Sequence, residues 1–141
     1  MRLSVLVDTG PLVAFLNRND TWHAWAKHQL AEIVPPLLTC ESVISEVCFL
    51  VRNLKGGSGA MVELVERSLV EIPFRLQDEA GSVQKLMNRY RDVPMSLADA
   101  CLVRMAEQQA RSVVLTLDAH FRLYRKHGRE AIPVIMPKPE R

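Results

Sequence analysis

The chain has 141 residues, of which 48% are hydrophobic and 24% are charged, and its formal net charge is +2. This composition is ordinary for a globular protein, and the length suits one compact domain over residues 1–141 with a sizeable core. The slight positive charge permits a nucleic-acid partner without arguing for one, and no segment is long and apolar enough to span a bilayer, so we expect a cytoplasmic protein.

The first predicted element is a short strand that ends in an acid. Valine and leucine dominate residues 3–7, as suits a strand that is covered on both faces. Gly10 and Pro11 stop this strand, and a helix with its body at residues 12–16 follows. Asp8 therefore lies at the carboxyl end of a strand, where open α/β sheets bind ligands, or it simply caps the next helix.

The rest of the chain alternates between helix and strand patterns. The predicted helices cover approximately residues 22–33, 41–54, 60–69, 78–90, 96–110 and 121–127. The predicted strands cover residues 37–39, 70–74, 113–117 and 132–136. Pro73 favours an edge position for its strand, and Lys55–Gly59 is expected to be a flexible helix stop. This order predicts the α/β class, with a parallel sheet sandwiched between helices.

Asp118 repeats the arrangement of Asp8, because it follows directly after the predicted strand at residues 113–117. The carboxyl ends of the strands in a parallel sheet share one edge. Asp8 and Asp118 should therefore lie on the same edge, and they would be close together if their strands are neighbours.

Two further acids lie in predicted helices. Glu46 falls next to Leu50 at the margin of the apolar face of its helix, where it either faces the core boundary or is a solvated helix acid. Asp99 lies among the apolar positions of its own helix. Ser96 three residues earlier also makes Asp99 a candidate member of a capping box, and an acid in the first turn can still present an oxygen to a ligand.

If these four carboxylates meet, protons or cations must neutralise them, because like charges at close range cannot all stay ionised. Oxygen ligands without histidine or cysteine favour Mg²⁺ or Mn²⁺ over zinc. A pair of such ions, roughly 3.5–4 Å apart, stabilises the attacking and leaving oxygens in phosphodiester hydrolysis. A carboxylate that is not fully engaged with metal can orient or deprotonate the attacking water.

Four segments together resemble PIN-domain ribonucleases of the VapC toxin type. They span nearly the whole chain and cover residues 7–14, 38–47, 94–100 and 115–121. Each segment is weakly specific alone, but four of them in order at this spacing are a strong signal. One departure is Gly10, which stands where many relatives carry an asparagine.

The resemblance implies a single PIN-like domain, a three-layer α/β/α sandwich with a central parallel sheet of about five strands. It implies an endoribonuclease that uses one or two Mg²⁺ or Mn²⁺ ions, forms a homodimer and is masked by an antitoxin protein. Carried over residue by residue, the catalytic and metal-coordinating acids are Asp8, Glu46, Asp99 and Asp118. The resemblance also makes Thr9 and Thr116 supporting hydroxyls.

Basic residues follow the last acid. Arg122, Arg125 and Lys126 either hold RNA phosphates beside the metal site or form a solvated helix face. Two other functions remain open. One is a PIN-like protein that binds RNA or a protein partner in a regulatory role without cutting, and the other is a nuclease directed at DNA.

The three cysteines are Cys40, Cys48 and Cys101. They show no metal-ligand spacing and are interpreted as small buried side chains in a reducing compartment.

Overall fold

A computed structural model describes residues 2–138, which contain a parallel five-stranded sheet in the order β3-β2-β1-β4-β7. Its strands are β1 (Ser4–Val7), β2 (Leu37–Leu38), β3 (Val70–Glu71), β4 (Ser112–Leu115) and β7 (Val134–Ile135). Every pairing within this sheet is parallel. The sheet of about five parallel strands that the sequence predicts is therefore confirmed, and the strand at residues 70–71 lies at an edge, as expected from Pro73.

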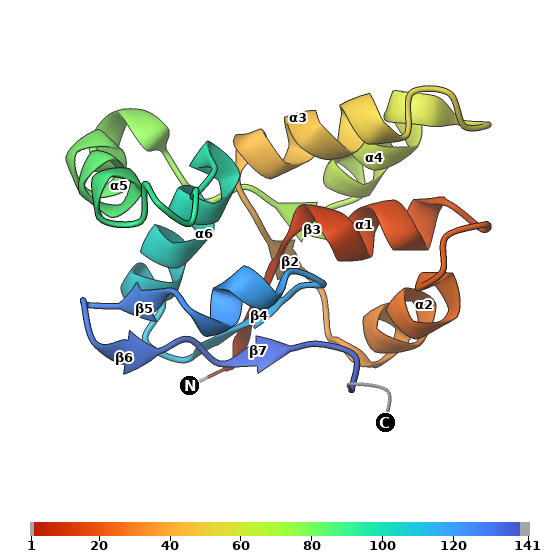
Figure 1. The fold of residues 1–141 in the computed structure, drawn as a ribbon. Helices are drawn as coiled ribbons and strands as arrows, with labels where there is room; N and C mark the ends of the chain where they lie inside the picture. Colours follow the sequence, from red (N-terminus) through yellow and green to blue (C-terminus); the bar gives the residue numbers. More distant parts are fainter. Residues whose placement is uncertain (1, 139–141) are drawn as a thin grey trace.

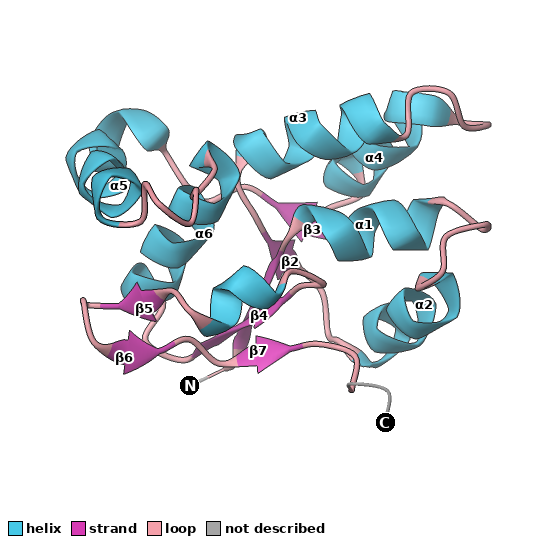
Figure 2. Cartoon of the chain, viewed as in Figure 1, coloured by secondary structure: helices cyan, strands magenta, loops and turns pink. Residues whose placement is uncertain are grey.

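Helices flank the sheet on both sides. They are α1 (Thr9–Leu16), α2 (His23–Glu32), α3 (Glu41–Leu50), α4 (Gly57–Glu66), α5 (Leu76–Arg89) and α6 (Leu97–Gln108). Figure 1 shows α5 and α6 on one side of the sheet and α1, α2 and α4 on the other, while α3 runs across the top of the view. The same arrangement, coloured by element type in Figure 2, gives the three layers of an α/β/α sandwich.

The two central strands carry the core. Four consecutive residues of β1 pair with four of β4, from Ser4 opposite Ser112 to Val7 opposite Leu115. Val7 and Leu115 are fully buried, because helices cover both faces of the sheet. This register brings the ends of β1 and β4 to the same level, which places the residues that follow them side by side.

The largest difference from the sequence prediction lies after β4. The predicted helix at residues 121–127 is wrong beyond its first turn, because a 3₁₀ helix at Ala119–Arg122 is followed by an antiparallel hairpin of β5 (Arg125–Lys126) and β6 (Glu130–Ala131). His127 and Gly128 have φ values of 52° and 80°, so the backbone turns there and cannot continue a right-handed helix.

The glycine-rich stretch also differs from the prediction. Gly56 has a φ of 86° and precedes α4, which begins at Gly57 instead of Ala60. The Ser58 hydroxyl donates a hydrogen bond of 2.8 Å to the carbonyl oxygen of Cys48 and so ties the start of α4 to α3. Residues 57–59 therefore form the first turn of α4 and do not belong to the break between the helices, which lies at residues 51–56. No helix among residues 2–138 is long and apolar enough to cross a membrane.

Candidate functional site

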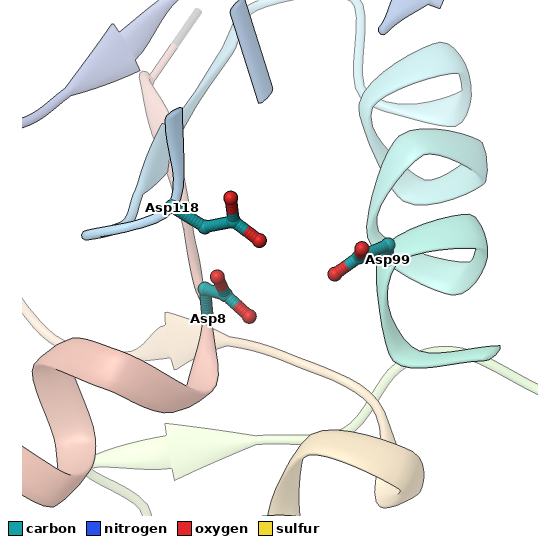
Figure 3. Close-up of side chains that lie close together, drawn as sticks. All are labelled: Asp8, Asp99 and Asp118. Atoms are coloured by element: carbon teal, nitrogen blue, oxygen red, sulfur yellow. The ribbon is translucent and has the colours of Figure 1, made fainter. Parts of the chain in front are cut away.

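Three aspartates from distant parts of the chain converge at the carboxyl edge of the sheet. One carboxylate oxygen from each of Asp8, Asp99 and Asp118 lies within 4.8 Å of the corresponding oxygens of the other two. Asp8 follows β1, Asp118 follows β4, and Asp99 projects from the first turn of α6. Figure 3 shows the three side chains pointing toward one another, with Asp99 approaching from the helix opposite the two strand ends. We call these three residues the aspartate cluster.

Asp8 is held firmly at the end of its strand. Its backbone amide donates to the carbonyl oxygen of Leu115, and its Oδ1 accepts a hydrogen bond of 2.8 Å from the amide of Thr9, which makes Asp8 the N-cap of α1. Its Oδ2 accepts a hydrogen bond of 2.7 Å from the hydroxyl of Thr116. The two interpretations of Asp8 as a helix cap and as a ligand-facing acid are therefore compatible.

Asp99 is likewise both a capping residue of its helix and an acid that faces the other two aspartates. Its backbone amide donates to Ser96 Oγ at 3.0 Å, and its carboxylate accepts a hydrogen bond from the backbone of Ser96, as in a capping box. The same carboxylate accepts a hydrogen bond of 2.9 Å at Oδ2 from the hydroxyl of Tyr124. Asp99 is only 8% exposed, so the remaining freedom of its side chain is small.

Asp118 lies at the mouth of the site, where 39% of its side chain is exposed. Its Oδ1 accepts a hydrogen bond from the backbone amide of His120 and lies 3.2 Å from His120 Nδ1. Its own amide donates to Thr116 Oγ1 at 2.9 Å. Asp118 is thus the member of the aspartate cluster that is most open to a substrate or to water.

The two threonines behave differently. Thr116 is fully buried, and its hydroxyl links Asp8 to the backbone of Asp118, which matches the supporting position proposed for it from the sequence. The hydroxyl of Thr9 is buried and has no hydrogen-bond partner among the described residues. Thr9 lines the same cleft as the three aspartates, and a buried hydroxyl without a partner there is consistent with a bound water or ligand.

Burial and mutual repulsion set the protonation of the cluster. Burial raises the pKa of Asp8 from 3.8 to about 6, against the opposing hydrogen bonds from Thr116 and Thr9, and the charges of Asp99 and Asp118 add to the increase. Burial also raises the pKa of Asp99, while its hydrogen bond from Tyr124 acts in the opposite direction. Bringing the three carboxylates together therefore costs free energy that a bound cation would recover.

Glu46 is near the aspartate cluster but does not belong to it. It lies in α3, is exposed, and lines the same open cleft of about 600 Å³ as the three aspartates. A second hollow of about 790 Å³ begins at Glu46 and continues between α3 and α6, past Phe49 and Leu97. The structure therefore places Glu46 at the border of the site, facing solvent.

The predicted RNA contacts lie outside this cleft. Arg122 is exposed, whereas Lys126 is half-buried and pairs with Glu130 across the hairpin. The guanidinium of Arg125 donates to the carbonyl oxygens of Arg122 and Tyr124 at 2.8 and 3.1 Å. The basic residues follow the aspartate cluster along the chain, but they do not surround it.

Tyr124 is the residue of this site that the sequence analysis missed. It is fully buried beneath the cleft and bonds directly to Asp99. The sequence offers only one weak signal for it, which is a second aromatic residue three positions after Phe121. That spacing is equally typical of an ordinary core residue, so only the structure reveals the contact.

The aspartate cluster fits a divalent cation by three criteria. Its ligands are oxygen atoms alone, which suit Mg²⁺ or Mn²⁺. The carboxylates repel one another, and Thr9, whose hydroxyl has no partner among the described residues, lines the same cleft. Thr116 and Tyr124 donate hydrogen bonds to the carboxylates of Asp8 and Asp99, as the outer partners of metal ligands do.

Comparisons with known proteins agree with this geometry. The family model of the PIN domain matches residues 5–126. Ribonuclease VapC26 of Mycobacterium tuberculosis is 25% identical over 136 residues, which cover 93% of this chain and 99% of that protein. The crystal structure of VapC20 of the same organism, described as a toxin that cleaves the sarcin–ricin loop, has a TM-score of 0.71 at 20% identity and covers 79% of this chain and 87% of its own. The likeness to VapC20 shows the fold.

Proposed function

This chain belongs to the PIN domain family, and we propose that it is a divalent-metal-dependent endoribonuclease of the VapC toxin type. The observation that carries the proposal is the aspartate cluster, whose oxygen atoms lie within 4.8 Å of one another in an open cleft. The similarity to a curated ribonuclease over nearly the full length of both proteins supports the choice of RNA as the substrate.

The proposed reaction is the hydrolysis of an RNA phosphodiester, in which water attacks phosphorus and the RNA oxygen leaves. Asp8, Asp99 and Asp118 would hold the metal, and one or two bound Mg²⁺ or Mn²⁺ ions would supply charge neutralisation for the phosphate. Asp118, the most exposed member, is the best placed to orient the attacking water. Glu46 faces the same cleft from α3 and would complete a four-carboxylate site through contacts to substrate or to metal-bound solvent.

Metal removal tests this proposal directly. Purified protein, shown to be folded and free of bound partner, is incubated with total cellular RNA in Mg²⁺, Mn²⁺ or EDTA. We expect discrete cleavage with either metal, none in EDTA, and recovery when Mn²⁺ is added back in excess. Cleavage that is unchanged by EDTA would contradict the metal-dependent mechanism, and intact RNA under every condition would contradict the nuclease assignment.

The basic segment after the cluster is proposed to hold RNA phosphates. Arg122 is exposed, whereas Arg125 is half-buried and donates to backbone carbonyl oxygens, so the variant with Glu at both positions is first checked for wild-type folding by circular dichroism. The double variant should bind RNA more weakly than the wild type, and the difference should be larger at low salt than at high salt, because phosphate contacts release counterions. Fluorescence anisotropy across a salt series measures this, and equal affinity at every salt concentration would place the RNA elsewhere.

We also propose that the protein works as a homodimer in the cytoplasm and is bound by an antitoxin protein, as in toxin–antitoxin pairs. Apolar side chains exposed beside the cleft support a protein partner there, since Phe49 is 60% exposed, Leu76 42% and Leu97 39%. The three free cysteines fit a reducing compartment. Light scattering of the purified protein tests the dimer.

A further inference from the structure

We propose that Tyr124 is a positioning residue that holds the carboxylate of Asp99 in the orientation needed to bind the metal ion. This role rests on the proposed function, because it assigns Tyr124 to the same metal site. The observation behind it is the hydrogen bond of 2.9 Å from the Tyr124 hydroxyl to Asp99 Oδ2, which is made entirely within the protein interior. Tyr124 lies 25 residues after Asp99, so the contact is a product of the tertiary fold.

The ring of Tyr124 is locked in place by two other aromatic side chains. Tyr90 and Phe121 both make edge-to-face contacts with it, at centroid distances of 5.1 and 5.3 Å and interplanar angles of 68° and 86°. None of the side chain of Tyr124 is exposed to solvent. A buried ring with such neighbours has one accessible orientation, so its hydroxyl is a fixed donor and not a mobile one.

The carboxylate of Asp99 has a second donor besides the fixed hydroxyl of Tyr124. Asp99 lies in the first turn of α6, where a carboxylate is also attracted back to the helix N-terminus and the Ser96 backbone. The Tyr124 hydroxyl adds a hydrogen bond at Oδ2, so that two donors together fix the carboxylate, which points toward Asp8 and Asp118 (Figure 3). Outer hydrogen bonds that orient metal ligands in this way are worth about 10- to 100-fold in metal affinity or activity.

Tyr124 also joins the metal site to the basic segment. The next residue, Arg125, begins β5, and its backbone amide donates a hydrogen bond of 2.9 Å to the hydroxyl of Tyr90. The hairpin that follows is attached to the neighbouring helices, since the amide of His127 donates to Glu107 and Arg89 donates to the carbonyl of Gly128. The proposed phosphate-binding segment therefore keeps a fixed position relative to Asp99.

The test compares Tyr124→Phe with Tyr90→Phe. Both variants remove one hydroxyl from the same aromatic cluster and keep the ring, but only Tyr124→Phe removes a hydrogen bond to the aspartate cluster. The affinity for Mn²⁺ is measured by electron paramagnetic resonance on the free protein without RNA. We expect binding that is about 10- to 100-fold weaker for Tyr124→Phe and close to the wild-type value for Tyr90→Phe.

Kinetics and structure separate positioning from general stability. Cleavage by Tyr124→Phe should need more Mn²⁺ for half-maximal rate, and a crystal structure of this variant should show the Asp99 carboxylate rotated away from its wild-type orientation. Wild-type affinity for Mn²⁺ in Tyr124→Phe, or an equal loss in both variants, would overturn the positioning role while leaving the proposed nuclease intact. A wild-type protein that takes up no Mn²⁺ would overturn the metal site itself, and this role with it.

Discussion

Replacing Asp8 by asparagine is expected to lower the rate of RNA cleavage by roughly 10³-fold or more, because metal-assisted hydrolysis draws several kcal/mol of transition-state stabilisation from its ions. Asp8 accepts hydrogen bonds from the amide of Thr9 and the hydroxyl of Thr116, and it is only 6% exposed. Asparagine has nearly the same shape, and its single oxygen can keep the hydrogen bond from Thr9, while its amide group faces the Thr116 hydroxyl in place of Oδ2. The change therefore removes a negative charge from the metal site with little effect on packing.

The control for this variant is an acid outside the site. Asp92 is exposed in the loop between α5 and α6, and Asp92→Asn makes the same chemical change without touching the cleft. Rates are measured under single-turnover conditions with Mn²⁺, on proteins with matching circular dichroism spectra. Wild-type cleavage by Asp8→Asn at equal purity would remove Asp8 from the active site.

Glu46→Gln, assayed in the same series, separates two positions that the sequence resemblance treats as equivalent. Glu46 is exposed at the border of the cleft, whereas the three aspartates lie close together and two of them, Asp8 and Asp99, are buried. We expect this substitution to reduce cleavage by about 10- to 100-fold, as for groups that act through another ligand or through solvent. A loss as large as that of Asp8→Asn would show that Glu46 moves into the cluster when metal and RNA bind.

In the absence of metal, we expect the Asp8→Asn variant to be more stable than the wild type at neutral pH, and this is the second large effect. The pKa of Asp8 rises from 3.8 to about 6 on folding, chiefly because the carboxyl is buried. Keeping Asp8 ionised in the folded state above pH 6 therefore costs about 3 kcal/mol, and asparagine avoids that cost. Function and stability thus oppose each other at this residue.

The pH dependence of the stability follows from the upward shift in the pKa of Asp8. Between pH 3.8 and about 6, the folded state binds a proton at Asp8 that the unfolded state releases, so the free energy of unfolding rises as the pH falls through this window. Below pH 3.8 the penalty disappears. The stability advantage of Asp8→Asn should therefore be largest above pH 7 and shrink toward zero near pH 4.

Urea unfolding of both proteins in EDTA, at several pH values between 4 and 8, measures this difference. A constant difference across the series would contradict the assignment of the penalty to Asp8. Adding Mn²⁺ at pH 7.5 should reverse the ranking, because a ligand at about 1,000 times its dissociation constant stabilises the folded wild type by about 4.1 kcal/mol, which exceeds the penalty of about 3 kcal/mol. The variant, which lacks one ligating charge, should gain less.

The elements that carry the strand-end acids can be predicted from local patterns in the chain. Buried runs before Asp8 and Asp118 predict strands that end in an acid, and the alternation of elements predicts a parallel sheet in which those ends share an edge. Ser96 predicts the start of the helix that carries Asp99. These predictions succeed because hydrophobic periodicity and capping are local properties, which a few neighbouring residues decide.

Which polar groups come into contact depends on the packing of distant elements and could not be predicted from local patterns. The pairing of β1 with β4 places Asp8 beside Asp118, and the packing of α6 adds Asp99 to them while Glu46 remains in solvent. The packing of the segment after Asp118 as a hairpin, and not a helix, accompanies the burial of Tyr124 beneath Asp99. Contacts between residues so far apart depend on how all the elements pack together, and no local pattern in the chain encodes them.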